Sequence, residues 1–157
     1  MGDENECRRA AQKAMNLLLR QDRTKKELQD RLYRAGFSEE ASRYALEYVE
    51  GYGYINDFRY AANYISLHKE SRSKKEMQYK LAGKGIPADI LADALSECGP
   101  EDEEQALRNG LKKRLKGRRP GELAWEEKNK VIRYFAQKGY SLSAIKRSLT
   151  DESLGLR

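Results

Sequence analysis

Seven positively charged side chains fall between residues 108 and 119 of the 157-residue chain, with no acidic residue among them. Lysine and arginine at this density can bind phosphate, because ammonium and guanidinium groups pair with its oxygens and displace counterions. The acidic run Glu101–Glu104 comes just before, and opposite charges at the two ends of a helix suit its dipole. The dipole accounts for only one or two charges at each end, so the excess indicates a surface for phosphate or an acidic partner. The seven are Arg108, Lys112, Lys113, Arg114, Lys116, Arg118 and Arg119.

Side chains that catalyse reactions or hold metals are scarce. His68 is the only histidine, so a Ser-His-Asp triad or a histidine-based metal site lacks its parts. It stands near Lys69 and Arg72, and we expect a solvated surface residue. Cys7 and Cys98 are far apart in the sequence, which favours buried thiols over a disulfide or a metal site. The sequence therefore predicts a protein that is not an enzyme and uses no cofactor or metal.

Composition narrows the class further. Charged residues make up 36% of the chain and hydrophobic ones 39%, so we expect a thin core drawn from regularly spaced positions. Residues 100–157 hold 14 basic and 9 acidic side chains, which is +5 of the net charge of +6. No apolar stretch is long enough to cross a membrane, and the acidic first residues do not resemble a secretory signal. We expect a cytoplasmic protein with no membrane partner.

A sequence motif occurs three times along the chain. Thr24–Gln29 recurs as Ser73–Gln78, shifted by 49 positions. The same shift relates Gly36 to Gly85, and a looser third copy ends at Gly139, which is 54 positions further on. The chain is therefore expected to contain three copies of one structural unit.

Each copy carries the signals of a helix with a defined start and end. Thr24 with Glu27, and Ser73 with Glu76, predict capping boxes, whereas the third copy has Glu127 at the place of the hydroxyl residue. Each glycine is expected to be the left-handed residue of a Schellman turn, in which the next residue contacts an apolar one across the turn. The expected contacts are Phe37 with Leu32, Ile86 with Leu81, and Tyr140 with Phe135.

An amphipathic segment precedes each capped helix, and another helix follows each glycine, so each unit contains three helices. No useful stretch alternates with period two. We therefore predict an all-α fold of three tandem three-helix repeats that form an elongated modular body. The predicted repeats are residues 5–52, 53–99 and 100–151.

Aromatic residues gather near the first joint between repeats. Tyr44 and Tyr48 are predicted on the apolar face of their helix, and Tyr52 and Tyr54 follow closely. We interpret the four as a partly solvent-exposed edge of the hydrophobic core. Fully exposed tyrosines would instead stack on bases or anchor a protein interface, and the sequence leaves this alternative open. Trp125, after the basic run, either packs into the third repeat, the interpretation that we favour, or contacts a partner.

Four groups of residues have a recognisable order and spacing. They are Arg23–Leu28 with Arg31, Leu32 and Gly36–Ser38; Gly53–Ala61; Lys80 and Leu81 with Lys84–Ile86; and Lys130–Phe135 with Gly139–Ser141. In these segments the chain resembles the RecX family of bacterial RecA regulators. Tyr60 stands where that family usually has phenylalanine, and Asn56 with Asp57 where it commonly has two aspartates.

The resemblance implies tandem three-helix repeats and binding to RecA in the groove of the RecA–DNA filament. It further implies that the protein opposes filament growth and lowers ATP hydrolysis and strand exchange during DNA recombination and repair. Non-specific binding to single- and double-stranded DNA is also implied.

The leading hypothesis is thus a monomeric regulator whose cations meet acidic protein surface and DNA phosphates in the filament. For Lys74 and Lys75 an exposed first-turn position explains the residues equally well, because Lys25 and Lys26 occupy the same place in the first copy. The predicted binding residues are Arg72, Lys74, Lys75, Lys112, Lys113, Arg114, Lys116, Arg118 and Arg119.

The alternative is a helix-turn-helix module that binds bare duplex DNA, with Gly36–Ser38 as the turn. The helix after this turn begins with Glu39 and Glu40, whose charge repels phosphate. Only the last helix of the third repeat, with Lys146 and Arg147, has the charge to lie on DNA.

Overall fold

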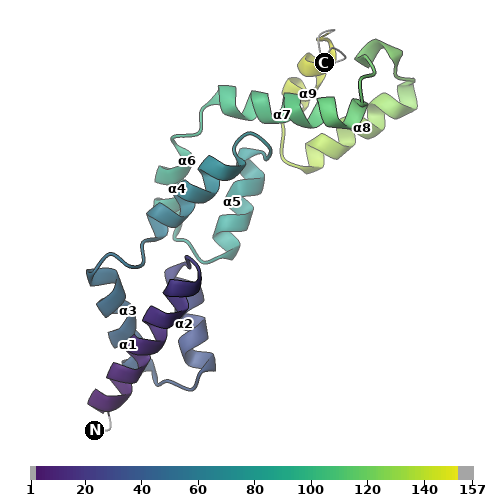
Figure 1. The fold of residues 1–157 in the computed structure, drawn as a ribbon. Helices are drawn as coiled ribbons and strands as arrows, with labels where there is room; N and C mark the ends of the chain where they lie inside the picture. The colour runs from purple at the N-terminus through teal and green to yellow at the C-terminus, as the bar shows by residue number, and fades with distance from the viewer. Residues whose placement is uncertain (1–2, 152–157) are drawn as a thin grey trace. The chain divides into compact units, whose positions relative to one another are not determined.

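The computed structural model describes residues 3–151, which form nine α-helices and one short 3-10 helix, with no strand in that range (Figure 1). Lead helix, capped helix and final helix follow one another three times, which confirms the predicted all-α fold of three-helix repeats. No helix of residues 3–151 is long and apolar enough to span a bilayer. The helices are α1 (Asp3–Arg20), α2 (Lys25–Arg34), α3 (Glu39–Gly51), α4 (Asp57–His68), α5 (Lys74–Gly83), α6 (Ala88–Leu95), α7 (Pro100–Leu115), α8 (Trp125–Gln137) and α9 (Leu142–Leu149), with η1 (Pro120–Glu122) between α7 and α8.

Contacts divide the chain into two compact units. The first unit contains the residues up to Asn63 together with Leu81–Asp93, and the second contains Tyr64–Lys80 together with the residues from Ala94 onward. Each unit holds one whole set of three helices and part of the middle set. The repeat boundaries predicted from the sequence, after residues 52 and 99, follow the spacing of the repeated motif. They do not coincide with the limits of the two units and stay a prediction.

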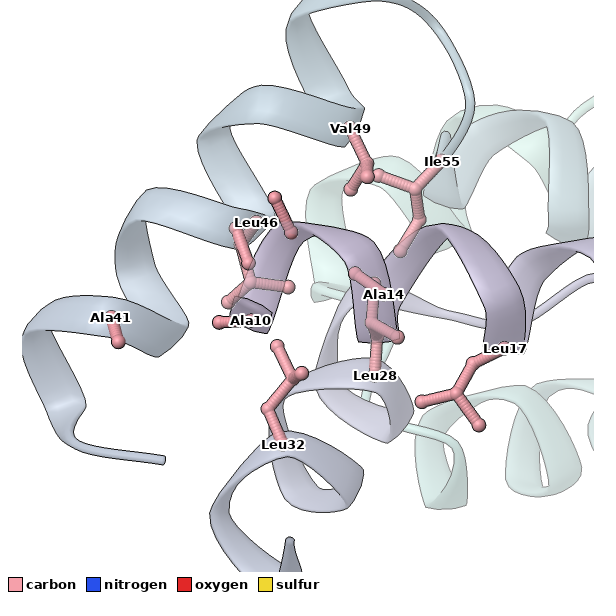
Figure 2. Close-up of a cluster of buried hydrophobic side chains, with 11 residues drawn as sticks. Ala10, Ala14, Leu17, Leu28, Leu32, Ala41, Leu46, Val49 and Ile55 are labelled. Carbon is pink, nitrogen blue, oxygen red and sulfur yellow. The ribbon is translucent and has the colours of Figure 1, made fainter. Parts of the chain in front are cut away.

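The core of the first unit lies among α1, α2 and α3. Leu28 and Leu32, one turn apart on α2, are fully buried, and Figure 2 shows them directed toward the alanines of α1. Alanine on a lead helix lets its neighbours approach closely, because the distance between helix axes depends on the side chains at the contact. The other buried apolar residues are Ala10, Ala11, Ala14, Leu17, Ala41, Ala45, Leu46, Val49 and Ile55.

The buried face of α3 differs from the prediction. Leu46 and Val49 point into the core beside two alanines, whereas Tyr44 and Tyr48 are exposed. The prediction placed Ala41 and Ala45 correctly but rotated the rest of the apolar stripe by about a quarter of a turn. Small and branched aliphatic side chains fill the narrow space against α1 better than phenol rings, whose hydroxyls would need buried partners.

The core of the second unit lies among α7, α8 and α9. Leucines one turn apart on α7 face the apolar stripe of α8 and the two buried aliphatic residues of α9. Tyr140 closes this core, and burial raises the pKa of its phenol. The cluster also contains Ala106, Leu107, Leu111, Leu115, Val131, Phe135, Ile145 and Leu149.

All three predicted glycine turns are confirmed. Gly36, Gly85 and Gly139 have φ angles of +93°, +87° and +103°, in the region that side chains disfavour. Each turn is closed by the two backbone hydrogen bonds of a Schellman motif. The bonds that span six residues run from Phe37 N to Leu32 O (3.2 Å), Ile86 N to Leu81 O (3.3 Å) and Tyr140 N to Phe135 O (3.2 Å).

The predicted capping box is complete in the first copy, only its hydroxyl half is found in the second, and the third copy departs from the prediction. Thr24 forms both halves of a capping box with Glu27, and the Ser73 hydroxyl accepts a hydrogen bond from the amide of Glu76 at 3.0 Å. In the third copy Glu127 is not at the cap position but is the third residue of α8. Its carboxylate accepts from the amide of Ala124 at 3.3 Å, which lets α8 begin almost one turn earlier than expected.

A joint inside the first unit connects the start of α2 to the turn that precedes α6. The Thr24 hydroxyl donates to the carbonyl oxygen of Lys84 at 2.6 Å, and the Lys84 ammonium lies 3.4 Å from the Glu27 carboxylate. The amide of Lys25 donates to Asp57, the first residue of α4, at 2.9 Å. The capped helix is thereby linked to two elements of the next repeat.

The same contacts recur inside the second unit between the start of α5 and the turn before α9. The Ser73 hydroxyl donates to the carbonyl oxygen of Lys138, and the Lys138 ammonium lies 3.8 Å from the Glu76 carboxylate. The amide of Lys74 donates to Glu103 of α7 at 3.2 Å. Two of the three contacts recur at equivalent positions, and the third uses a carboxylate of the next lead helix in both units, the first residue of α4 and the fourth of α7. The sequence repeat therefore encodes the joint as well as the helices.

Candidate nucleic-acid interface

The basic run lies on the solvent-facing side of α7 and in the loop after it. Because α7 buries leucines at positions 107, 111 and 115, the lysines and arginine at 112–114 are left exposed. The loop then turns through Lys116, with φ of +52°, and Gly117, with φ of +85°. The exposed members of this cationic surface are Lys112, Lys113, Arg114, Lys116, Arg118 and Arg119.

Two of these cations are held by neighbours, and no ion pair is found for the other four among the described residues. Arg118 donates to both carboxylate oxygens of Glu127, at 2.8 and 3.2 Å. This hydrogen bonding lowers the pKa of Glu127 and raises that of Arg118. The guanidinium of Arg114 lies 4.0 Å from the centre of the Tyr134 ring, a cation–π contact that orients it.

The glutamate of the third copy has a partner of a different kind from those of the first two copies. In the first two copies, the glutamate three residues after the cap pairs with a lysine of the next repeat. In the third copy Glu127 pairs with Arg118 instead, and the cap residue Ala124 has no hydroxyl to donate. Arg118, a residue predicted to bind phosphate, therefore has an acidic partner within its own repeat.

A cavity of about 330 Å³ lies between α7 and α8. Three cations, Lys113, Arg114 and Lys138, line it together with the hydroxyl residues Ser71 and Tyr134, and none of its lining residues is acidic. Such a set of donors suits a phosphate group, because every polar side chain around it can offer an N–H or O–H.

A second cavity of about 430 Å³ lies beside the loop. Lys116 and Lys130 line it with Arg114 and the paired Arg118 and Glu127. Lys130 lies on α8 and was not among the predicted binding residues. The two cavities share Arg114, so cationic side chains continue from the end of α7 onto α8.

Of the binding residues predicted near α5, Lys75 reaches the edge of this surface, because it lines a cavity of about 600 Å³ with Tyr134, Lys138 and Glu76. Lys74 and Lys75 line a different cavity of the second unit, of about 500 Å³, which Arg147 shares but which also contains Glu103 and Glu104. Lys75 packs its stem against the turn at Gly139, a joint role that favours the structural interpretation of this lysine. Arg72 is half-buried and lines none of the cavities described here.

Sequence reasoning missed residues on α8 that the structure adds to the surface. Lys130, Tyr134 and Lys138 follow one another at intervals of four, which places them on one face of the helix. That spacing was a usable signal. Trp125 was wrongly expected to pack into the repeat: its side chain is 75% exposed at the start of α8, directly after the basic loop.

The histidine, the two cysteines and the acidic run before the basic residues were the side chains considered for catalysis or metal binding, and each has a structural role or setting. His68 is half-buried and packs against Tyr64 in a tilted arrangement, with 4.4 Å between ring centres, so it is less solvated than expected. Cys98 is buried as predicted, whereas Cys7 is half-buried. In residues 3–151 no group of three His, Cys, Asp or Glu side chains has the arrangement of a metal site. Asp102 pairs with Lys69 at 3.8 Å.

Comparisons with known proteins agree with this architecture. Residues 10–48 match the family profile described as RecX, first three-helix domain, and residues 101–149 match RecX, third three-helix domain. Regulatory protein RecX of Clostridium perfringens strain 13 is 31% identical over 152 residues, covering 94% of this chain and 72% of that protein. Regulatory protein RecX of Caldanaerobacter subterraneus subsp. tengcongensis is 29% identical over 146 residues, covering 92% and 71%.

A solved structure has the same fold. The crystal structure of RecX from Lactobacillus salivarius matches with a TM-score of 0.83 at 23% identity, covering 96% of this chain and 99% of that one. Profiles for two of the three-helix domains, relatives over nearly the whole chain and this shared architecture lead to one conclusion: the chain belongs to the RecX family of regulatory proteins.

Proposed function

We propose that this chain binds RecA recombinase filaments on DNA in the cytoplasm and inhibits filament growth, ATP hydrolysis and strand exchange. It acts as a monomer and as a binding protein, without cofactor. The observation that carries the proposal is the membership of the RecX family, whose relatives bear the name regulatory protein. The cationic surface of the second unit supports it, because a regulator in a nucleoprotein groove meets phosphates as well as protein.

A regulator of this kind changes a filament only if it binds one state of the filament more tightly than another. Phosphate contacts alone are nearly indifferent to the protein that coats the DNA. The cationic surface therefore supplies affinity and rapid association, while contacts to RecA supply the preference for the filament.

The alternative, sequence reading of bare duplex by a helix-turn-helix unit, has less support. The final helix of the first repeat begins with the exposed residues Glu39 and Glu40, which would face phosphates. The last helix, α9, carries the exposed cations Lys146 and Arg147 and is the remaining candidate for such contact. Non-specific contact through α9 is compatible with the proposed function.

The test compares binding of the chain to naked single-stranded DNA with binding to the same strand coated with RecA and a slowly hydrolysed ATP analogue. We expect tighter binding to the coated strand. Preference for naked duplex of one sequence, with no effect on RecA, would favour the alternative.

Neutralising the cationic surface tests its role. For a variant in which four of its charges are removed, listed below, we expect weaker binding to naked single-stranded DNA. We also expect a shallower slope when log affinity is plotted against log salt concentration. If all four charges meet phosphates, the slope falls by up to about 2.8, at about 0.7 for each charge. The variant carries Lys112→Gln, Lys113→Gln, Lys116→Gln and Arg119→Gln.

A matched control removes four exposed cations from the first unit instead. If both variants lose affinity and slope equally, net charge alone explains the binding and the cationic surface is not a site. The control carries Lys13→Gln, Arg20→Gln, Arg31→Gln and Arg34→Gln, all at exposed positions.

A further inference from the structure

Four exposed tyrosines in the first unit form a continuous row of rings, here called the tyrosine ladder. Tyr44, Tyr48, Tyr52 and Tyr54 are 48%, 40%, 64% and 46% exposed. Consecutive ring centres along the ladder are 6.4, 5.0 and 5.8 Å apart. These separations are typical of interacting aromatic pairs, so the rings support one another while each residue stays partly exposed to solvent.

The backbone holds the ladder in place. The first three tyrosines follow at intervals of four and therefore lie on one face of α3 and its C-cap. The chain then turns at Gly53, with φ of +72°, and the amide of Tyr54 donates to the carbonyl oxygen of Val49 at 2.8 Å. Arg59 donates to the carbonyl oxygen of Gly53 at 3.0 Å and fixes the turn. A preformed aromatic row loses little side-chain entropy on binding.

The charges around the ladder are acidic, in a chain whose net charge is positive. Between residues 39 and 57 there are five acidic side chains and one basic one besides the ladder, and Arg59 adds a second cation at the Gly53 turn. Glu50 among them pairs with Lys25 at 3.1 Å, and Asp57 accepts from the backbone of the same lysine. The carboxylates repel nucleic-acid phosphates, which disfavours base stacking as the use of the ladder. The acidic residues are Glu39, Glu40, Glu47, Glu50 and Asp57, and the basic one is Arg43.

We infer that the tyrosine ladder is a docking surface for an extended protein segment that carries arginine or lysine at alternate positions. Cations bind over phenol rings, and the flanking carboxylates add attraction of the same sign. Alternate residues of an extended chain are about 6.6–6.8 Å apart, close to the ring spacing, so successive cations meet successive rings. The assignment of that segment to RecA rests on the proposed function. In that case the tyrosine ladder binds the protein of the filament and the cationic surface binds its DNA.

The experiment measures binding of the full chain to naked single-stranded DNA, to RecA-coated single-stranded DNA and to a labelled peptide with arginine at every second residue. The test variant is Tyr48→Ala/Tyr52→Ala, in which alanine preserves the helix. Tyr48→Phe/Tyr52→Phe keeps the rings and is expected to bind like the parent chain. Tyr79→Ala removes a tyrosine in the second unit that is more exposed, at 81%, and is the control for loss of any surface aromatic.

We expect the alanine variant to lose about tenfold or more in affinity for coated DNA, the size of loss found at aromatic hot spots. Its affinity for naked DNA should stay within about twofold of the parent value, and its affinity for the peptide should fall. Equal losses on naked and coated DNA would show a base-stacking platform and overturn the inference. Unchanged binding to coated DNA and peptide would overturn it too.

If the parent chain shows no preference for coated DNA, the proposed function fails and the peptide decides the inference by itself. Peptide binding that the alanine variant loses and the phenylalanine variant keeps then supports the ladder as a docking surface. Peptide binding that is absent, or equal in both variants, refutes it.

Discussion

Alanine at Gly85 tests whether the joint of the first unit depends on close contact between backbones. A Cβ at position 85 would lie 2.4 Å from Cβ and 2.6 Å from Cγ of Lys26. The Lys26 Cβ is fixed to the backbone of α2 and cannot swing aside, so the joint must open. Gly36 is the matched control, because its φ of +93° is similar to the +87° of Gly85 while nothing lies within 4 Å of its added Cβ.

The expected magnitudes follow from these contacts. Left-handed backbone costs an L-residue about 1–2 kcal/mol, which is the whole expected loss for Gly36→Ala. Overpacking of a close contact adds about 1–3 kcal/mol, so Gly85→Ala should lower the free energy of unfolding by about 2–5 kcal/mol. Both positions belong to the first unit, so both variants report on the same compact structure.

The assay is unfolding in urea, monitored by circular dichroism. The midpoints are compared provided that the dependence of the unfolding free energy on urea concentration is unchanged. We expect a clearly larger shift for Gly85→Ala than for Gly36→Ala. Equal shifts would refute the claim that the turn before α6 packs tightly on α2. Gly139→Ala, whose Cβ would lie 2.8 Å from both Lys75 Cβ and Ser73 Oγ, extends the test to the second unit.

Two further predictions concern single side chains. Arg118→Gln should return the pKa of Glu127 toward the ordinary glutamate value, because the hydrogen bond from Arg118 is the main cause of its lowering. The pair contributes stability above the unfolded-state pKa of about 4.3 and loses it as pH falls through the lower folded-state pKa. An NMR titration of the Glu127 carboxyl group measures its pKa in the parent chain and in the variant, and identical values would contradict the pairing. Burial raises the pKa of the Cys98 thiol, and the thiolate is the reactive form, so iodoacetamide near neutral pH should label the half-buried Cys7 first. Mass spectrometry of the labelled peptides follows both rates, and equal rates would refute the difference in burial.

Sequence predicted the features that depend on neighbours within a few residues. The capping box at Thr24 and the turns at the three glycines are made by hydrogen bonds between residues at most five positions apart, so their signals are complete in the local sequence. The apolar stripes of α2 and α8 were equally readable, because one turn of a helix sets the spacing of Leu28 and Leu32.

Features that depend on distant neighbours were not predictable. The exposure of Tyr44 and Tyr48 follows from the rotation of α3 against α1, which two overlapping apolar stripes on α3 left undecided. The pairing of Arg118 with Glu127 depends on how the loop folds back. The joint roles of Lys84 and Lys138 appear only once the turn of one repeat meets the cap of another.

Hydrolysis of ATP by RecA on single-stranded DNA tests the central claim most directly. Increasing amounts of the chain, added to preformed filaments, should lower the steady-state rate of hydrolysis in a dose-dependent way. A rate that stays unchanged at saturating chain, under salt conditions where the chain binds DNA, would contradict the proposal that it regulates the recombinase.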